Sequence, residues 1–243
     1  MSELSNYIDE YLKTEYTLKS TLKDSVQSSV YLYQKNDSAK QIVKISQKNR
    51  NDHVLRRLRG QLNKNTATIY EVCSNDDDVT VLEEYISGAT LRHIVEANGG
   101  TLKRELAVKY ALDICNGLVF IHSLGIIHRD IKPSNIIITE QGEAVIIDFG
   151  IARLTDDSKY SDTKNLGTAG YAAPEQFGIY QSGPVTDIYA VGVLLNELLL
   201  GVHPTIDTPK GKLGKVINKC IMAQMSKRYQ NVSELAEVLN KLL

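Results

Sequence analysis

The sequence predicts an α+β fold with a small, β-rich N-terminal lobe and a larger, mostly helical C-terminal lobe. Two observations carry this prediction: short β-rich runs dominate the first third of the chain, and long helical patterns dominate the rest. The change falls near Ser87-Gly88. We therefore expect one bilobal domain over 1–243, with 1–86 as the N-terminal lobe and 87–243 as the C-terminal lobe.

The first lobe is expected to be a sheet with one helix. Turn-like residues separate its β-rich runs, and one segment carries apolar residues at helical spacing. An acidic run at 74–78 is read as a solvated turn of a hairpin. The expected elements are strands at 29–34 and 41–46, a helix at 51–62, and strands at 68–73 and 79–85.

The second lobe is expected to be helical with one small hairpin. The hairpin would turn at Gln141-Gly142, and a polar segment follows at 155–166. The expected elements are a helix at 102–124, strands at 136–139 and 144–147, and helices at 186–200 and 232–243.

Bulk composition excludes several classes of function. The formal net charge of −1 gives no basic footprint for nucleic acid. The longest apolar run, 189–200, is too short to span a bilayer, and residues 2–16 are too polar for a secretory signal. The three cysteines, Cys73, Cys115 and Cys220, form neither a zinc pattern nor a disulfide framework. We expect a soluble cytoplasmic protein without a membrane segment, unless the chain is part of a longer one.

Two motifs carry the chemistry. Residues 128–135 read HRDIKPSN and residues 148–150 read DFG. Phosphoryl transfer needs a carboxylate that accepts the proton of the attacking hydroxyl, and oxygen ligands for magnesium. Asp130, Asn135 and Asp148 can fill these roles as base, second metal ligand and main metal ligand, because the strands beside them would bring the polar groups together.

On these motifs, 18 residues apart from Asp130 to Asp148, the chain resembles the eukaryotic-type protein kinase family, including its bacterial Ser/Thr branch. Residues 167–175 resemble the end of an activation segment, with Ala173-Pro174-Glu175 in the A-P-E position. The resemblance implies that Asp187 anchors the catalytic loop and that Arg228 pairs with Glu175.

The resemblance implies a serine/threonine kinase that uses ATP with Mg²⁺ or Mn²⁺. Lys132 would neutralise charge on the γ-phosphate, and Thr168 would touch Asp130 and Lys132. The Gln41–Lys44 stretch resembles the third-strand V-A-I-K motif, and Glu83 would be the gatekeeper beside the hinge. The nucleotide-binding residues expected from the resemblance are Lys44, Val30, Ser25, Ser28, Glu84 and Ile86, together with Asp148.

The N-terminal lobe departs from the family pattern. No glycine precedes Gly60, and Lys23, Ser25 and Ser28 stand where the three glycines of the phosphate loop belong. The only acid between Lys44 and Glu71 is Asp52, which is early for the glutamate that pairs with the lysine in active kinases. Lys44 would pair with Asp52, with another acid such as Asp148, or with none. Ile42 replaces a small residue and would crowd the adenine.

These departures leave three functions open. The first is an active Ser/Thr kinase acting on protein substrates of unknown identity, with an activating partner or self-association to organise the first lobe. The second is a pseudokinase that serves as a binding or scaffolding module, and the third is another transferase, such as one that moves a nucleotidyl group. Autophosphorylation would use Arg129 as the phosphate grip, with these candidate acceptors: Ser158, Ser161, Thr163, the preferred one, and Thr168.

Overall fold

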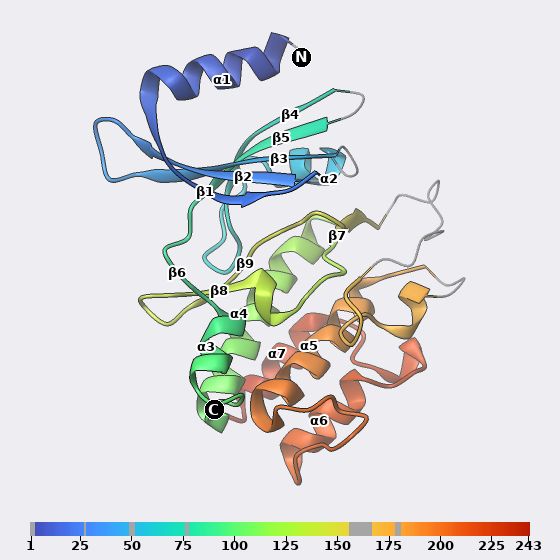
Figure 1. The fold of residues 1–243 in the computed structure, drawn as a ribbon. Coiled ribbons are helices and arrows are strands. Elements are labelled where there is room, and N and C mark those ends of the chain that lie inside the picture. The colour runs from blue at the N-terminus through green and yellow to red at the C-terminus, as the bar shows by residue number, and fades with distance from the viewer. Residues whose placement is uncertain (1–2, 27, 49–51, 76–77, 156–166, 178–180) are drawn as a thin grey trace. The chain divides into compact units, whose positions relative to one another are not determined.

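The computed structural model of the chain describes residues 3–26, 28–48, 52–75, 78–155, 167–177 and 181–243, with side chains from residue 7 onward. It separates into two compact units (Figure 1). The N-terminal unit comprises 1–63 and 67–86, and the C-terminal unit comprises 64–66 and 87–243.

The N-terminal unit is a five-stranded antiparallel sheet with two helices. The strand order is β1-β2-β3-β5-β4, so β1 and β4 are the edges. Its elements are α1 (Glu3–Glu15), β1 (Tyr16–Asp24), β2 (Ser28–Lys35), β3 (Gln41–Lys48), α2 (Asp52–Leu58), β4 (Ile69–Ser74) and β5 (Asp78–Glu84).

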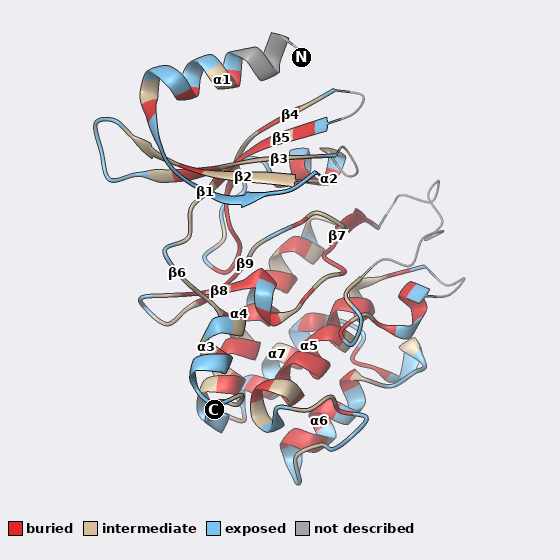
Figure 2. Cartoon of the chain, viewed as in Figure 1, coloured by how far each residue is buried: buried red, intermediate tan, exposed pale blue. Residues whose placement is uncertain are grey.

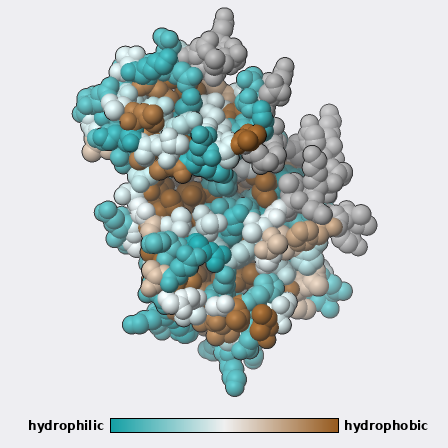
Figure 3. All heavy atoms as spheres, viewed as in Figure 1, coloured by the Kyte–Doolittle hydropathy of each residue, from teal (hydrophilic) through white to brown (hydrophobic). Residues whose placement is uncertain are grey.

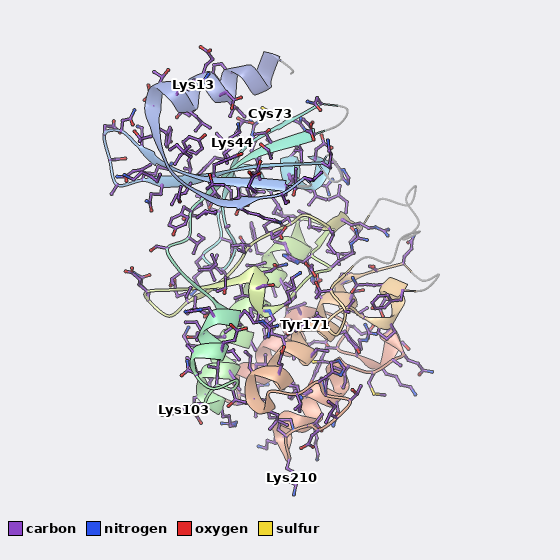
Figure 4. All side chains as sticks on the ribbon, viewed as in Figure 1. Lys13, Lys44, Cys73, Lys103, Tyr171 and Lys210 are labelled. Atoms are coloured by element: carbon purple, nitrogen blue, oxygen red, sulfur yellow. The ribbon has the colours of Figure 1, made fainter. Side chains whose placement is uncertain are left out.

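The two helices pack on opposite faces of this sheet, because successive strand residues point to opposite sides. We call the first the α1 face, on which Ile42, Cys73 and Leu82 form a core with Ile8 and Leu12 of α1. Figure 1 shows α1 running above the sheet, and Figure 4 shows Lys44 and Cys73 between this helix and the strands.

We call the opposite side the α2 face. Ser74, one residue after Cys73, bonds to Asp52 and Arg56 of α2 at 2.8 Å each. The register aligns Val30 with Ile45 and Leu32 with Val43, which places these four aliphatic side chains on the α2 face as one patch. The sheet therefore separates residues that are neighbours in sequence, such as Val43 and Lys44.

The C-terminal unit is mostly helical. Helices α4 and α5 supply much of its core, and Figure 2 shows them largely buried. Gly117 of α4 lets residues 64–66 approach closely, since a Cβ there would lie 2.7 Å from the Asn65 carbonyl oxygen. Its helices and strands are β6 (Gly88–Thr90), α3 (Leu91–Ala97), α4 (Arg104–Ser123), β7 (Ile126–Ile127), β8 (Ile136–Thr139), β9 (Ala144–Ile146), β10 (Arg153–Leu154), α5 (Pro184–Leu200), α6 (Lys212–Cys220) and α7 (Val232–Asn240), with 3₁₀ turns at Pro133–Asn135, Pro174–Phe177 and Met225–Lys227.

The expected elements are present, with changes at their ends. The helix expected over 51–62 stops at Leu58, because Gly60 takes a left-handed φ of 73° and its N–H bonds to Ile69. The expected α+β class is confirmed. Helices α1, α3 and α6 and strand β1 were not predicted. In the part of the chain that the structure describes, no helix is long and apolar enough to cross a membrane.

Candidate active site

Asp130 is the centre of a closed hydrogen-bond network in the C-terminal unit. Its Oδ2 accepts bonds from Lys132 Nζ at 2.6 Å and from Asn135 Nδ2 at 2.9 Å. Its Oδ1 accepts a bond from the Thr168 hydroxyl at 2.7 Å, and Lys132 also donates to that hydroxyl at 2.6 Å. The expected contact of Thr168 with Asp130 and Lys132 is therefore confirmed.

This network keeps Asp130 ionised. Burial by itself would raise the pKa of the carboxyl group, but the bonds from Lys132 and Thr168 and the charge of Lys132 outweigh it. The pKa of Asp130 is accordingly lowered from its ordinary value. A carboxylate in this state can accept a hydrogen bond from a hydroxyl group near neutral pH.

Asp187 fixes the backbone that presents this network. Its carboxylate is fully buried at the start of α5 and accepts bonds from the backbone N–H groups of His128 at 2.9 Å and Arg129 at 2.8 Å. His122 Nε2 lies 2.8 Å from the same carboxylate. Burial would raise the pKa of Asp187, yet these partners lower it. The expected anchoring role of Asp187 is confirmed, whereas His122 was not predicted.

The DFG segment lies beside the catalytic loop. The N–H of Ile147 bonds to the Asn135 carbonyl at 3.0 Å, and the buried Phe149 ring packs on His128 with centroids 5.2 Å apart. Asp148 is exposed, has a left-handed φ of 64° and accepts a bond from Gly150 N–H at 3.0 Å. Burial lowers the pKa of His128 despite the nearby charges of Asp187, Asp130 and Asp148, which favours the neutral imidazole.

Asn135 and Asp148 provide suitable oxygen donors for a divalent cation. The Asn135 amide nitrogen donates to both the backbone and the side chain of Asp130, which turns its amide oxygen to the other side. Asp148 uses Oδ1 for Gly150 and has a second carboxylate oxygen. Mg²⁺ prefers one or two such protein oxygens and completes its shell with phosphate and water, so the donor set fits magnesium.

A buried ion pair holds the Ala173-Pro174-Glu175 segment in place. Arg228 Nη1 and Nη2 bond to the two carboxylate oxygens of Glu175 at 2.7 and 2.8 Å, and Thr186 donates to Glu175 at 2.9 Å. The expected Arg228–Glu175 pair is confirmed as a bidentate one. Gln176, which was not predicted, donates to the Arg129 carbonyl at 2.9 Å and so links this segment to the catalytic loop.

The regulatory acceptors fall mostly outside what the structure describes. Ser158, Ser161 and Thr163 lie outside the described residues. Arg129 has a left-handed φ of 67° and donates from Nε to the Ile151 carbonyl at 2.8 Å. The hydroxyl of Thr168 is engaged by the Asp130 network, so it is a poor phosphate acceptor in this conformation.

In the N-terminal unit, Lys44 forms an ion pair that sequence reasoning did not name. Its Nζ lies 2.5 Å from Oδ1 of Asp9 on α1, and its side chain is 15% exposed. Asp52 is bound instead to Arg56 at 3.2 Å and to Ser74. Lys44 lies on the α1 face and Ser74 on the α2 face, which explains why Asp52 does not serve Lys44.

The residues expected to bind the nucleotide do not gather on one side of this sheet. Lys44 belongs to the α1 face and Val30 to the α2 face. Lys44 also lines a cavity of about 330 Å³ with Asp9 and with Ser25 and Ser28 of the β1–β2 turn. The two serines bond to each other, since Ser25 Oγ donates to the Ser28 carbonyl at 2.8 Å and accepts from its N–H at 3.1 Å. These two hydrogen bonds stabilise the β1–β2 turn.

The hinge residues continue from β5. The N–H of Glu84 donates to the Thr68 carbonyl at 2.8 Å, and the Glu84 side chain accepts from Thr68 N–H at 3.2 Å. Glu83, the expected gatekeeper, is aligned with Val43 and so belongs to the α2 face. Ile86 ends the N-terminal unit. The part of these backbones in nucleotide binding stays a prediction.

The fold and the site motifs are those of a protein kinase domain, and comparison with known proteins agrees. The family described as "Protein kinase domain" matches residues 14–243. The chain therefore belongs to the protein kinase family.

Several bacterial kinases are similar to the chain. It is 33% identical over 207 residues to a probable serine/threonine-protein kinase of Clostridium acetobutylicum, which covers 74% of this chain and 31% of the relative. A probable serine/threonine-protein kinase of Clostridium perfringens is 32% identical over 223 residues, or 79% of this chain and 32% of the relative. The serine/threonine-protein kinase PknB of Mycolicibacterium smegmatis is 41% identical over 133 residues, which cover 53% of this chain and 21% of the relative. The matched regions span about a third or less of these curated relatives.

Proposed function

We propose that the chain is an ATP-dependent protein kinase that transfers the γ-phosphoryl group to serine or threonine hydroxyls of proteins. The observation that carries this proposal is the Asp130 network. A carboxylate has about four acceptor sites, and Thr168, Lys132 and Asn135 fill one on Oδ1 and two on Oδ2. The remaining site on Oδ1 can receive the hydroxyl of a substrate.

In this mechanism, Asp130 orients the substrate hydroxyl and accepts its proton while the oxygen bonds to the γ-phosphorus and the bond to ADP breaks. Lys132 Nζ, 2.6 Å from Asp130, is placed to neutralise charge on the transferring group. Asn135 and Asp148 would hold magnesium, which when bound supplies the positive charge that the triphosphate requires. Manganese, which accepts the same oxygen ligands, is the expected substitute.

The test is phosphate transfer by the purified chain. With Mg²⁺ and labelled ATP, we expect label on serine and threonine of the chain itself and of a generic basic protein. Asp130→Asn should reduce the rate by about 10²–10⁴-fold and keep ATP binding. Absence of transfer from the unaltered chain would refute the proposal, and addition of AMP instead of phosphate would indicate a nucleotidyl transferase.

A second candidate function is that of a pseudokinase binding module. The observation that favours it is the Lys44–Asp9 ion pair, which occupies the lysine that the family uses for nucleotide phosphates. A magnesium-dependent thermal shift with ATP but no transfer to any acceptor would support this alternative.

A further inference from the structure

We propose that Lys23, and not Lys44, is the lysine of the N-terminal unit that binds the nucleotide phosphates. This inference rests on the proposed ATP-dependent function and deepens it. It follows from the strand register of the sheet and from the position of α1, which together decide which face can accept a nucleotide.

The α1 face is already occupied. Ile8 and Leu12 of α1 are each 2% exposed and pack on Ile42 and Leu82. A purine ring on this face would have to displace the helix and expose these groups. Lys44 belongs to this face because it follows Ile42 by two residues, and its charge is neutralised by Asp9. Lys44 lines the cavity with Ser25 and Ser28, but its ammonium group is already paired with Asp9 and so offers less charge to the phosphates of a nucleotide.

The α2 face has the opposite character over β2 and β3. Its patch of Val30, Leu32, Val43 and Ile45 is aliphatic, as a surface that takes the flat face of a purine must be. Helix α2 is anchored at the far edge, through Ser74 of β4.

Lys23 stands at the end of this patch. The β1–β2 register aligns it with Val30, so the two side chains share the α2 face about 5 Å apart at Cβ. Among the described residues that the strand register assigns to this face, Lys23 is the one with a positive charge. It is exposed and stands where the phosphate loop of the family has its first glycine. A nucleotide with its base on the patch and its phosphates toward the β1–β2 turn would meet this ammonium group.

The same arrangement explains why α2 carries no acid for Lys44. An acid on the α2 face could not reach a lysine on the α1 face, and Asp9 supplies the partner from α1. Helix α1 lies almost wholly before residue 14, where the family match begins, so Asp9 lies outside the matched residues.

The test is chemical labelling with an acyl-phosphate derivative of ATP. The amine of a lysine beside the phosphates attacks the acyl carbon, an amide forms, ATP leaves, and the lysine proton goes to solvent. Peptide mass spectrometry then identifies the labelled lysine. We expect label on Lys23 that excess Mg²⁺–ATP prevents, and its loss in Lys23→Met. The matched control is Lys19→Met, because Lys19 lies in the β1 bulge outside the register.

Binding of ATP provides the second readout. Lys23→Met should weaken ATP binding by at least about tenfold, since a charge-assisted bond to phosphate is worth about 1.5–3 kcal/mol. ATP-protected label on Lys44, or on no lysine of the chain, would overturn the inference. Label on Lys23 without phosphate transfer would refute the proposed kinase activity alone, whereas transfer with label on Lys44 would refute the lysine assignment alone.

Discussion

Replacing Arg228 by methionine should destabilise the C-terminal unit strongly. Arg228 is 2% exposed and makes two bonds to Glu175, at 2.7 and 2.8 Å. Methionine fills much of the space but leaves the Glu175 carboxylate buried without a cation, with hydrogen bonds from Thr186 and from the backbone N–H of Glu175 remaining. Removing one member of a buried ion pair costs about 3–5 kcal/mol of unfolding free energy, so we expect a loss in this range.

The loss should depend on pH in a defined direction. In the native chain, burial would raise the pKa of Glu175, but Arg228 and Thr186 hold it below the ordinary value. A carboxyl group with a lowered pKa stabilises the fold above its unfolded pKa, and this stability is lost as pH falls through the folded pKa. Without Arg228, burial raises the pKa of Glu175, so the variant gains stability as the carboxylate becomes protonated. The difference between native and variant should narrow from pH 7 toward about pH 4.

Urea unfolding followed by circular dichroism measures both effects. Arg104→Met is the matched control, because its ion pair with Glu105 is exposed and worth about 0–1 kcal/mol. The double variant Arg228→Met with Glu175→Leu should lose less than the single one, since no buried charge is left unpaired. A loss below about 1 kcal/mol for Arg228→Met, or a difference that widens at low pH, would show that the pair is not a buried one.

Three other changes test separate parts of the structure. Thr168→Val removes one of the bonds that lower the pKa of Asp130, so the acidic limb of the pH–rate profile should move to higher pH; an unchanged limb would contradict this. Asn135→Ala should raise the magnesium concentration needed for half-maximal rate, and an unchanged magnesium titration would remove Asn135 from the metal ligands. Leu12→Ala should cost about 2–5 kcal/mol of unfolding free energy, whereas Tyr7→Ala, at an exposed position of α1, should cost little; equal losses would argue against α1 as a core element.

The C-terminal unit could be predicted well because its signals are local. Each of the two motifs places its functional side chains within a few residues of each other. The apolar run in α5 predicts a buried helix. The contacts of Asp187, Thr168 and Arg228 followed from resemblance to the family, and the geometry confirms them. His122 and Gln176 act through side-chain hydrogen bonds that no sequence pattern distinguishes.

The N-terminal unit was harder to predict because its signals are weak. Helix α1 buries Ile8 and Leu12, an apolar stripe too narrow to stand out in a polar segment. Strand β1 is an edge strand with eight of nine residues exposed, so it lacks the alternation that marks a strand. Figure 3 likewise shows hydrophobic groups scattered over this unit in that view, as is normal for a surface. The face to which Lys44 points depends on strand register, which a short motif does not fix.

Because α1 covers Cys73, the reactivity of this thiol reports whether α1 is docked. Cys73 is 3% exposed in the core that α1 completes, and burial raises its pKa, so the thiol is protected twice from alkylation and oxidation. A chain shortened to begin at residue 14 would lose Ile8 and Leu12 and uncover this sulfur. Its rate of modification by a maleimide is the reference for an uncovered thiol, and the ratio of the full chain's rate to this reference gives the fraction of molecules in which α1 is undocked, without any need for turnover.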